Sequence, residues 1–253
     1  MNSRKIALVT GGSRGLGRDM AISIAKKGID VMLTYQSNET AANEVVKDIV
    51  SLGQKAKAFQ LDTSNIKNFT SFVATLSDYL TQQYGNSNID FLVNNAGTGV
   101  YGSVTDTTEE AFDSMMNIHF KGVYFFTQKL LPLINDGGTI INVSSGLTRI
   151  TFPNVSAYAS MKGAIETYTK CLAKELGARK ITANVIAPGA IATDFGGASN
   201  KNNEGKRNAI AGITALGRVG EPEDIGGVVA FLCTPEAGWM NGQRIELSGG
   251  MMV

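Results

Sequence analysis

The residues most suited to proton transfer are Ser145, Tyr158 and Lys162. Tyr158 and Lys162 are four positions apart in an apolar, helix-like stretch, so both side chains lie on one face of a helix. A phenol with a pKa near 10 is a poor acid at neutral pH, but a neighbouring ammonium stabilises the phenolate and lowers that pKa. The pair could therefore give a proton to the alkoxide that forms when a carbonyl group is reduced. Tyr–Lys pairs at this spacing also occur by chance on surface helices, so the context decides.

The elements that must position these residues follow from the hydrophobic pattern. Near-continuous apolar runs such as IALV indicate strands buried on both faces, as in parallel sheets. Their alternation with helix-like segments predicts an α/β fold, a doubly wound parallel sheet (Rossmann fold) of seven strands flanked by helices on both faces. The strands are expected at 6–9, 31–35, 56–61, 91–93, 139–143, 182–186 and 244–247, and the helices at 18–27, 40–52, 69–84, 110–134, 157–176 and 222–232.

Polar motifs follow several of these strands. Ser145 comes after the strand at 139–143, the motif NNAG (94–97) follows 91–93, and PGAIAT (188–193) follows 182–186. Ligands bind at the carboxyl edge of open α/β sheets, so these segments are expected to meet in one crevice.

A glycine loop, TGGSRGLG (10–17), directly follows the first strand and opens the first helix. Glycines there permit a tight turn and let the backbone approach a pyrophosphate at the helix N-terminus. Glycine-rich turns of this kind also serve packing alone, so the loop by itself is a weak signal.

The charges near this loop favour NADP(H) over NAD(H). The second strand ends in Tyr35-Gln36-Ser37-Asn38, with no acid before Glu39 to accept from a ribose 2′-hydroxyl. Arg14, inside the loop, offers a planar charged fork suited to a 2′-phosphate. The alternative is a solvated surface arginine.

In this order along residues 5–250, the motifs make the chain resemble the single-domain short-chain dehydrogenase/reductases, and among them the 3-oxoacyl-(acyl carrier protein) reductases. The motifs are TGGSRGLG, Asp62-Thr63, NNAG, NVSS with Tyr158 and Lys162, PGAIAT, and GRVGEPEDIGG with NGQRIELSGG near the end. Several motifs in order are far more specific than any one.

The resemblance implies roles for individual residues. Tyr158 would donate the proton, and Lys162, which would also bind ribose, would lower the pKa of the phenol together with the oxidised nicotinamide. Ser145, favoured over Ser144 by its spacing to the tyrosine, would hydrogen-bond the substrate oxygen. The implied cofactor-binding residues are Gly11, Ser13, Arg14, Gly15, Leu16, Gly17, Gln36, Ser37, Asp62, Thr63, Asn95, Ala96, Gly97, Tyr158, Lys162, Pro188, Gly189, Ile191 and Thr193. No metal is expected.

One position departs from the family. Where many members have an asparagine three residues before a glycine, this chain has His119, its only histidine. In relatives that asparagine helps to hold a water in a proton relay to the lysine, and an imidazole can also donate and accept. We therefore count His119 as a candidate catalytic residue, with a packing histidine in the helix as the alternative.

The substrate is less well specified. The segment 193–214 lacks periodicity and follows a strand, which favours a substrate lid over a disordered insert. Leu147, Ile150, Phe152 and Val155 suggest a partly apolar pocket, and Lys201, Lys206 and Arg207 are lid charges that could contact a substrate or be solvated. Arg179 could meet an acidic carrier protein, although the acidic turn at 135–138 weakens that reading.

We therefore expect one domain over 1–253 that reduces a ketone or 3-oxoacyl group with NADP(H); alternatives are an alcohol dehydrogenase working oxidatively and an idle dinucleotide sensor. The partner is a small carbonyl, alcohol or acyl thioester. With a net charge of +1 and no basic run, no nucleic-acid partner is expected. No apolar run suits a signal peptide or membrane span, which predicts a cytoplasmic protein. Cys171 and Cys233 are expected as buried thiols, and the resemblance implies a homotetramer built through the helices at 110–134 and 157–176 and the C-terminal tail.

Overall fold

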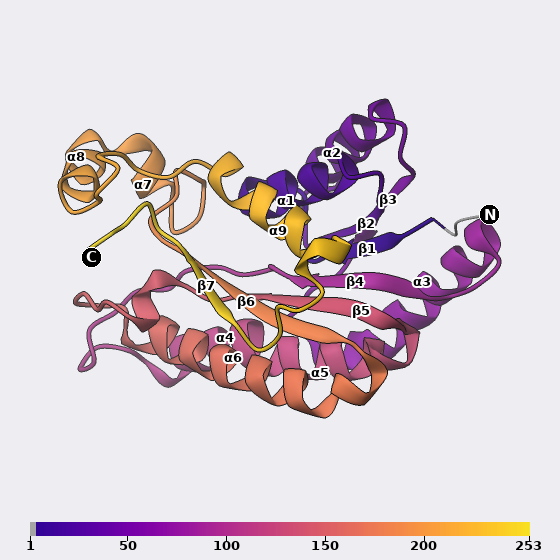
Figure 1. Ribbon diagram of the computed structural model, residues 1–253. Helices are drawn as coiled ribbons and strands as arrows, with labels where there is room; N and C mark the ends of the chain where they lie inside the picture. The colour runs from indigo at the N-terminus through magenta and orange to yellow at the C-terminus, as the bar shows by residue number, and fades with distance from the viewer. Residues whose placement is uncertain (1–3) are drawn as a thin grey trace.

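The computed structural model describes residues 4–253 and contains a seven-stranded sheet (Figure 1). All pairs are parallel, in the order β3-β2-β1-β4-β5-β6-β7. The strands are β1 (Ile6–Val9), β2 (Asp30–Tyr35), β3 (Ala56–Gln60), β4 (Ile89–Asn94), β5 (Ile134–Val143), β6 (Thr182–Pro188) and β7 (Arg244–Leu247). The predicted fold class is confirmed.

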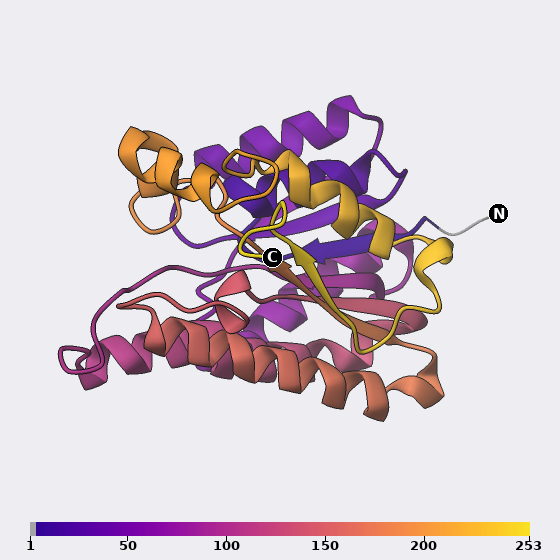
Figure 2. The same ribbon diagram turned by 60° about the vertical axis from the view of Figure 1, so that its left-hand side comes forward.

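Helices cover both faces of the sheet, which lies between two layers in both ribbon views (Figures 1 and 2). The helices are α1 (Gly15–Ala25), α2 (Glu39–Ser51), α3 (Phe69–Tyr84), α4 (Glu109–Met116), α5 (Gly122–Leu130), α6 (Ser156–Glu175), α7 (Ser199–Asn202), α8 (Glu204–Gly212) and α9 (Glu223–Leu232). Ala7 and Val9 belong to the hydrophobic core between the sheet and α1, α2 and α9. Ile6 and Leu8 belong to the second core, between the sheet and α3, α5 and α6. This alternation explains the continuous apolar strands, because both faces are buried.

The predicted helix over 110–134 is wrong as a single, regular element. Between α4 and α5 the chain forms a π-helical turn, η2 (Asn117–Lys121), and after α5 it continues as a short 3₁₀ turn, η3 (Leu131–Leu133). Pro132 lies in η3, and a proline cannot continue an α-helix interior because it lacks the N–H group. Ile134 therefore begins β5.

Two further expectations need correction. The segment 193–214 shows no periodicity in the sequence, yet it contains the helices α7 and α8. Asn203 begins α8 by accepting a hydrogen bond from the Lys206 N–H. Cys171 is exposed, because it lies on the outer face of α6, while Cys233 is buried as expected.

The helices α7 and α8 and the C-terminus lie together at the carboxyl edge of the sheet (Figure 1). Within residues 4–253 no helix is long and apolar enough to cross a membrane. In the same range no group of three His, Cys, Asp or Glu side chains is placed to hold a metal ion.

Candidate active site

A cavity of about 950 Å³ opens along the carboxyl edge of the sheet. All four candidate catalytic residues line it: His119, Ser145, Tyr158 and Lys162. Every predicted cofactor residue except Ser37 lines it too. The topology thus brings together segments that are far apart in the sequence.

The glycine loop is held against the end of β4. The Asn95 amide nitrogen donates to the carbonyl oxygens of Thr10 (2.9 Å) and Gly11 (3.2 Å), and the Thr10 hydroxyl accepts from the N–H of Ala96 (3.0 Å). A Cβ at Gly17 would lie 2.2 Å from the Gly11 carbonyl oxygen. The loop can therefore fold this tightly only with glycine at that position.

The residues here fit a dinucleotide phosphate. Helix α1 begins without a side-chain cap and without an acidic residue in its first turn, so its first N–H groups are open to an anion. Arg14 is exposed and lines the cavity, as does Gln36. Asp62, which also lines the cavity, already accepts from the Ser64 N–H (2.9 Å) and hydroxyl (2.7 Å). This charge distribution suits a 2′-phosphate better than a bare ribose.

Helix α6 carries two members of the proposed proton-transfer group. The Lys162 Nζ donates to the Val143 carbonyl oxygen (2.8 Å) and lies 5.5 Å from the centroid of the Tyr158 ring. Ser145 begins the 3₁₀ turn η4 (Gly146–Thr148), where its hydroxyl accepts from the Leu147 N–H (3.2 Å). Ser144 instead donates to Glu166 (2.7 Å), so its hydroxyl is engaged within the protein.

Burial controls the pKa values of this group. It raises the pKa of the Tyr158 phenol, and interaction with the Ser145 hydroxyl opposes that rise in part. It lowers the pKa of Lys162 to about 7. Desolvation is the largest influence on the phenol pKa here, whereas the lowering expected from the sequence includes the charge of an oxidised nicotinamide. A positive charge brought in by a ligand would act in the expected direction.

His119 lies beside this group on the π-helical turn η2. Its Nε2 is 2.6 Å from the Thr98 carbonyl oxygen, which can only accept, so Nε2 carries the proton. Nδ1 is then a buried acceptor, and it has no hydrogen-bond partner within residues 4–253. The ring stands edge-to-face with Tyr158 at 5.1 Å, and burial followed by the charge of Lys162 lowers the His119 pKa to about 3. His119 is therefore a neutral imidazole at the site.

Aromatic side chains form the outer end of the cavity. Tyr101, Phe152 and Phe195 line it, and the ring centroids of Tyr101 and Phe195 lie 6.2 and 5.9 Å from that of Tyr158. The expected apolar residues Leu147, Ile150, Phe152 and Val155 all belong to the lining. This end of the cavity is suited to a flat, apolar ligand.

The charged residues that the sequence suggested for substrate contact differ in the partners they contact. Lys206 lines the cavity, whereas Lys201 pairs with Asp194 (3.1 Å) and Arg207 with Glu221 (3.6 Å). Arg179 donates to Asp136 (2.8 Å) and to the carbonyl oxygens of Leu131 and Ile134. Its guanidinium therefore contacts the turn that leads into β5, so part of its hydrogen-bonding capacity is used within the protein.

Sequence reasoning did not single out Tyr101, Phe195 or Met251 as site residues. Tyr101 had a signal, since it is an aromatic side chain between Gly99 and Gly102 in the loop after the NNAG motif. Phe195 and Met251 had none, because only the packing of the α7–α8 segment and the C-terminal tail brings them to the cavity.

Comparisons with known proteins agree with this geometry. Residues 11–252 match the family described as enoyl-(acyl carrier protein) reductase. A tetrahydroxynaphthalene reductase, PfmaG of Pestalotiopsis fici, is 37% identical over 97% of this chain and 91% of its own.

Two solved structures have the same fold. The reductase LugOII, which catalyses keto-reduction at C1 during lugdunomycin biosynthesis, is 38% identical over the full length of both chains, with a TM-score of 0.93. The landomycin C-6 ketoreductase LanV, solved with NADP and rabelomycin, is 36% identical over 98% of this chain and 96% of its own, with a TM-score of 0.89. The chain belongs to the short-chain dehydrogenase/reductase family.

Proposed function

We propose that this protein is an NADPH-dependent ketoreductase that converts a ketone to an alcohol. The observation that carries the proposal is the meeting of Ser145, Tyr158 and Lys162 with an uncapped glycine-loop helix in one cavity. LanV, which has the same fold, was solved with NADP. When bound here, the reduced nicotinamide would supply the hydride.

The chain's own residues would then bind the ketone and deliver a proton. The hydroxyl of Ser145 would donate a hydrogen bond to the carbonyl oxygen, which becomes more negative as the hydride arrives. Tyr158 would give its phenolic proton to that oxygen. Lys162 would stabilise the phenolate left behind, and burial of the pair strengthens this interaction.

We further propose that the ketone sits in a flat, fused-ring molecule. The rings of Tyr101 and Phe195 lie against the Tyr158 ring, and Phe152, Leu147 and Ile150 add apolar surface to the same cavity. PfmaG is named for a naphthalene, a fused two-ring compound. A 3-oxoacyl thioester on a carrier protein fits less well, because Arg179 is occupied by Asp136.

The test follows NADPH absorbance with purified protein and 1-tetralone, a two-ring aryl ketone, with NADH and a short 3-oxoacyl thioester as comparators. We expect turnover of tetralone with NADPH. Tyr158→Phe should lower kcat on the order of 100-fold or more while NADPH still binds, because the proton donor is lost.

The matched control is Tyr168→Phe. Tyr168 lies on the same helix, but its hydroxyl donates to the Tyr124 carbonyl oxygen (3.3 Å), outside the cavity. The Tyr168→Phe substitution should leave kcat unchanged. Turnover of the thioester alone would point to acyl reduction, and turnover only of tetralol with NADP⁺ would point to an oxidative dehydrogenase.

A further inference from the structure

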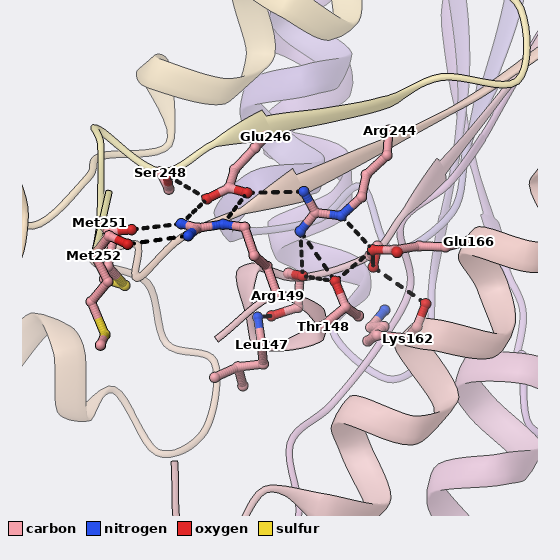
Figure 3. Close-up of polar contacts among 12 residues, drawn as sticks. Leu147, Thr148, Arg149, Lys162, Glu166, Arg244, Glu246, Ser248, Met251 and Met252 are labelled. Carbon is pink, nitrogen blue, oxygen red and sulfur yellow. Dashed lines mark hydrogen bonds and ion pairs between the residues drawn. The ribbon is translucent and has the colours of Figure 1, made fainter. Parts of the chain in front are cut away.

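A row of side chains with alternating charge runs from helix α6 to the C-terminal tail (Figure 3). Arg244 on β7 bridges Glu166 on α6 (2.8 Å) and Glu246 (2.9 Å). Arg149 then holds both carboxylate oxygens of Glu246, at 2.8 and 2.7 Å. The four side chains are between 18% and 36% exposed, so water screens them less than it screens a surface pair.

The first arm of this network ends at Glu166. Its Oε1 accepts from the hydroxyls of Ser144 (2.7 Å) and Thr148 (2.6 Å), which flank Ser145. Arg244 adds a longer contact to the Ser145 carbonyl oxygen (3.4 Å). Glu166 lies one turn beyond Lys162, so the helix that carries the lysine also fixes the segment that carries the serine.

The second arm ends at Arg149. Besides Glu246, its guanidinium donates to the carbonyl oxygens of Met251 (2.6 Å) and Met252 (3.2 Å), as Figure 3 shows. The tail in turn pairs with the segment after α8, where the Met252 N–H donates to the Ile213 carbonyl oxygen (2.9 Å). Met251 and Ile213 both line the cavity, so this arm fixes a wall at its substrate end.

We propose that Glu166 and Arg149 are positioning residues, each at the end of one arm of this network, an inference that rests on the proposed ketoreductase function. The Glu166 arm sets Ser145 relative to Tyr158 and Lys162, and therefore governs kcat. The Arg149 arm sets the tail wall formed by Met251, and therefore governs KM for the ketone. Neither side chain lines the cavity, so neither is expected to hold NADPH.

The first test compares kcat and KM for 1-tetralone with NADPH in excess. Glu166→Ala should lower kcat at least about tenfold with KM within about twofold, because a misplaced catalytic group costs up to about 100-fold. Glu166→Gln should recover most of kcat, since its amide oxygen can accept the same hydrogen bonds. Glu175→Ala, an exposed glutamate at the end of the same helix, is the control.

The second arm is tested with Arg149→Ala and Arg149→Lys. Both should raise KM about fivefold or more, the scale of losing one or more hydrogen bonds, with a smaller change in kcat. Arg149→Lys is not expected to restore the wild-type KM, because a single ammonium cannot hold a carboxylate and two carbonyl oxygens in one plane. Arg18→Ala, which removes an exposed pair with Asp48, is the control.

A readout without turnover separates this inference from the proposed function. Hydrogen exchange of the backbone amides should rise at 144–149 in Glu166→Ala and at 213–216 and 249–253 in Arg149→Ala. Exchange that rises equally at both places in both variants, or kcat and KM that move together, would overturn the proposal that the two arms position different parts of the site. Wild-type protein that reduces no ketone, with exchange changes as expected, would overturn the function and not the positioning.

Discussion

At the scale of single residues, one side chain of the site has an unpaired buried polar atom among residues 4–253, His119. The carbonyl oxygen of Thr98 fixes the Nε2–H tautomer, and the buried Nδ1 is left with a free lone pair among the described residues. An unpaired buried acceptor is costly unless something binds it. We propose that Nδ1 accepts from a water that serves Lys162.

His119→Ala should therefore lower kcat at least about tenfold while the Kd for NADPH stays within about twofold, because a proton path is lost and the phosphate site is untouched. His119→Asn should keep more activity, since an amide can also accept. Stopped-flow rates and fluorescence titration measure the two quantities. If kcat per folded molecule stays within about twofold of wild type, His119 is a packing residue.

Arg14 makes a second prediction at this scale. Arg14→Ala should raise the Kd for NADPH about tenfold or more and leave the Kd for NADH unchanged, because one charge-assisted contact to phosphate contributes about 1.5–3 kcal/mol. Titration of both nucleotides measures the difference. Arg18→Ala is the control, as that side chain is held by Asp48 (2.8 Å). Equal losses for both nucleotides would contradict a 2′-phosphate contact.

At the scale of elements, the π-helical turn depends on close backbone contacts. A Cβ at Gly122, where α5 begins, would lie 2.1 Å from the Thr63 carbonyl oxygen and 2.7 Å from that of Asn117. Because backbone atoms cannot rotate away, the two segments must separate if any side chain is added there.

Gly122→Ala should lower the free energy of unfolding by about 1–3 kcal/mol, measured by urea denaturation. Gly227→Ala supplies the opposite case. Gly227 is exposed within α9 and its Cβ would meet nothing within 4 Å, so alanine should stabilise the protein by up to about 1 kcal/mol. Equal effects of the two substitutions would show that the contact at Thr63 does not limit the packing.

At the scale of the whole molecule, the outer surface of α4 and α5 carries exposed rings. Phe112, Tyr124 and Phe125 are each 36–41% exposed. Exposed apolar groups of this size favour an interface between protein chains. We propose that these helices form the predicted tetramer contact.

Phe125→Asp should convert the tetramer to smaller species, because a charge would be buried against an apolar partner. Light scattering after gel filtration gives the mass. Val50→Asp, on the opposite layer and 53% exposed, should leave the mass unchanged. A wild-type monomer would rule out the tetramer.

Most of the fold, and the meeting of the glycine loop with the strand ends at one cavity, can be predicted from local patterns. Apolar runs such as Ile6–Val9 and the glycine loop are determined by neighbours in sequence, and parallel strands bring their carboxyl ends together. The π-helical turn was missed because it depends on tertiary contacts of Gly122. The helix α8 was missed because a short polar segment gains its stability from packing, here of Ile210 against Val219 and Met251.

The sequence indicates the charges that act on the pKa of Tyr158 but not the burial that raises it. Residue types indicate which charges are near, but desolvation depends on how completely the fold covers a group, and Tyr158 is only 8% exposed. The aromatic substrate end was only partly predictable for a similar reason. Tyr101, Phe195 and Met251 reach the cavity from three segments that no sequence period connects.

That same arrangement affects how such a protein can evolve. Tyr101, Phe152, Phe195 and Met251 come from four separate loops or tails, whereas the residues proposed for hydride and proton transfer lie at strand ends and on one face of α6. Single substitutions in one loop can therefore reshape acceptance of a new ketone while the reaction itself is inherited unchanged. Laboratory selection for altered ketones is expected to collect its mutations in those four segments.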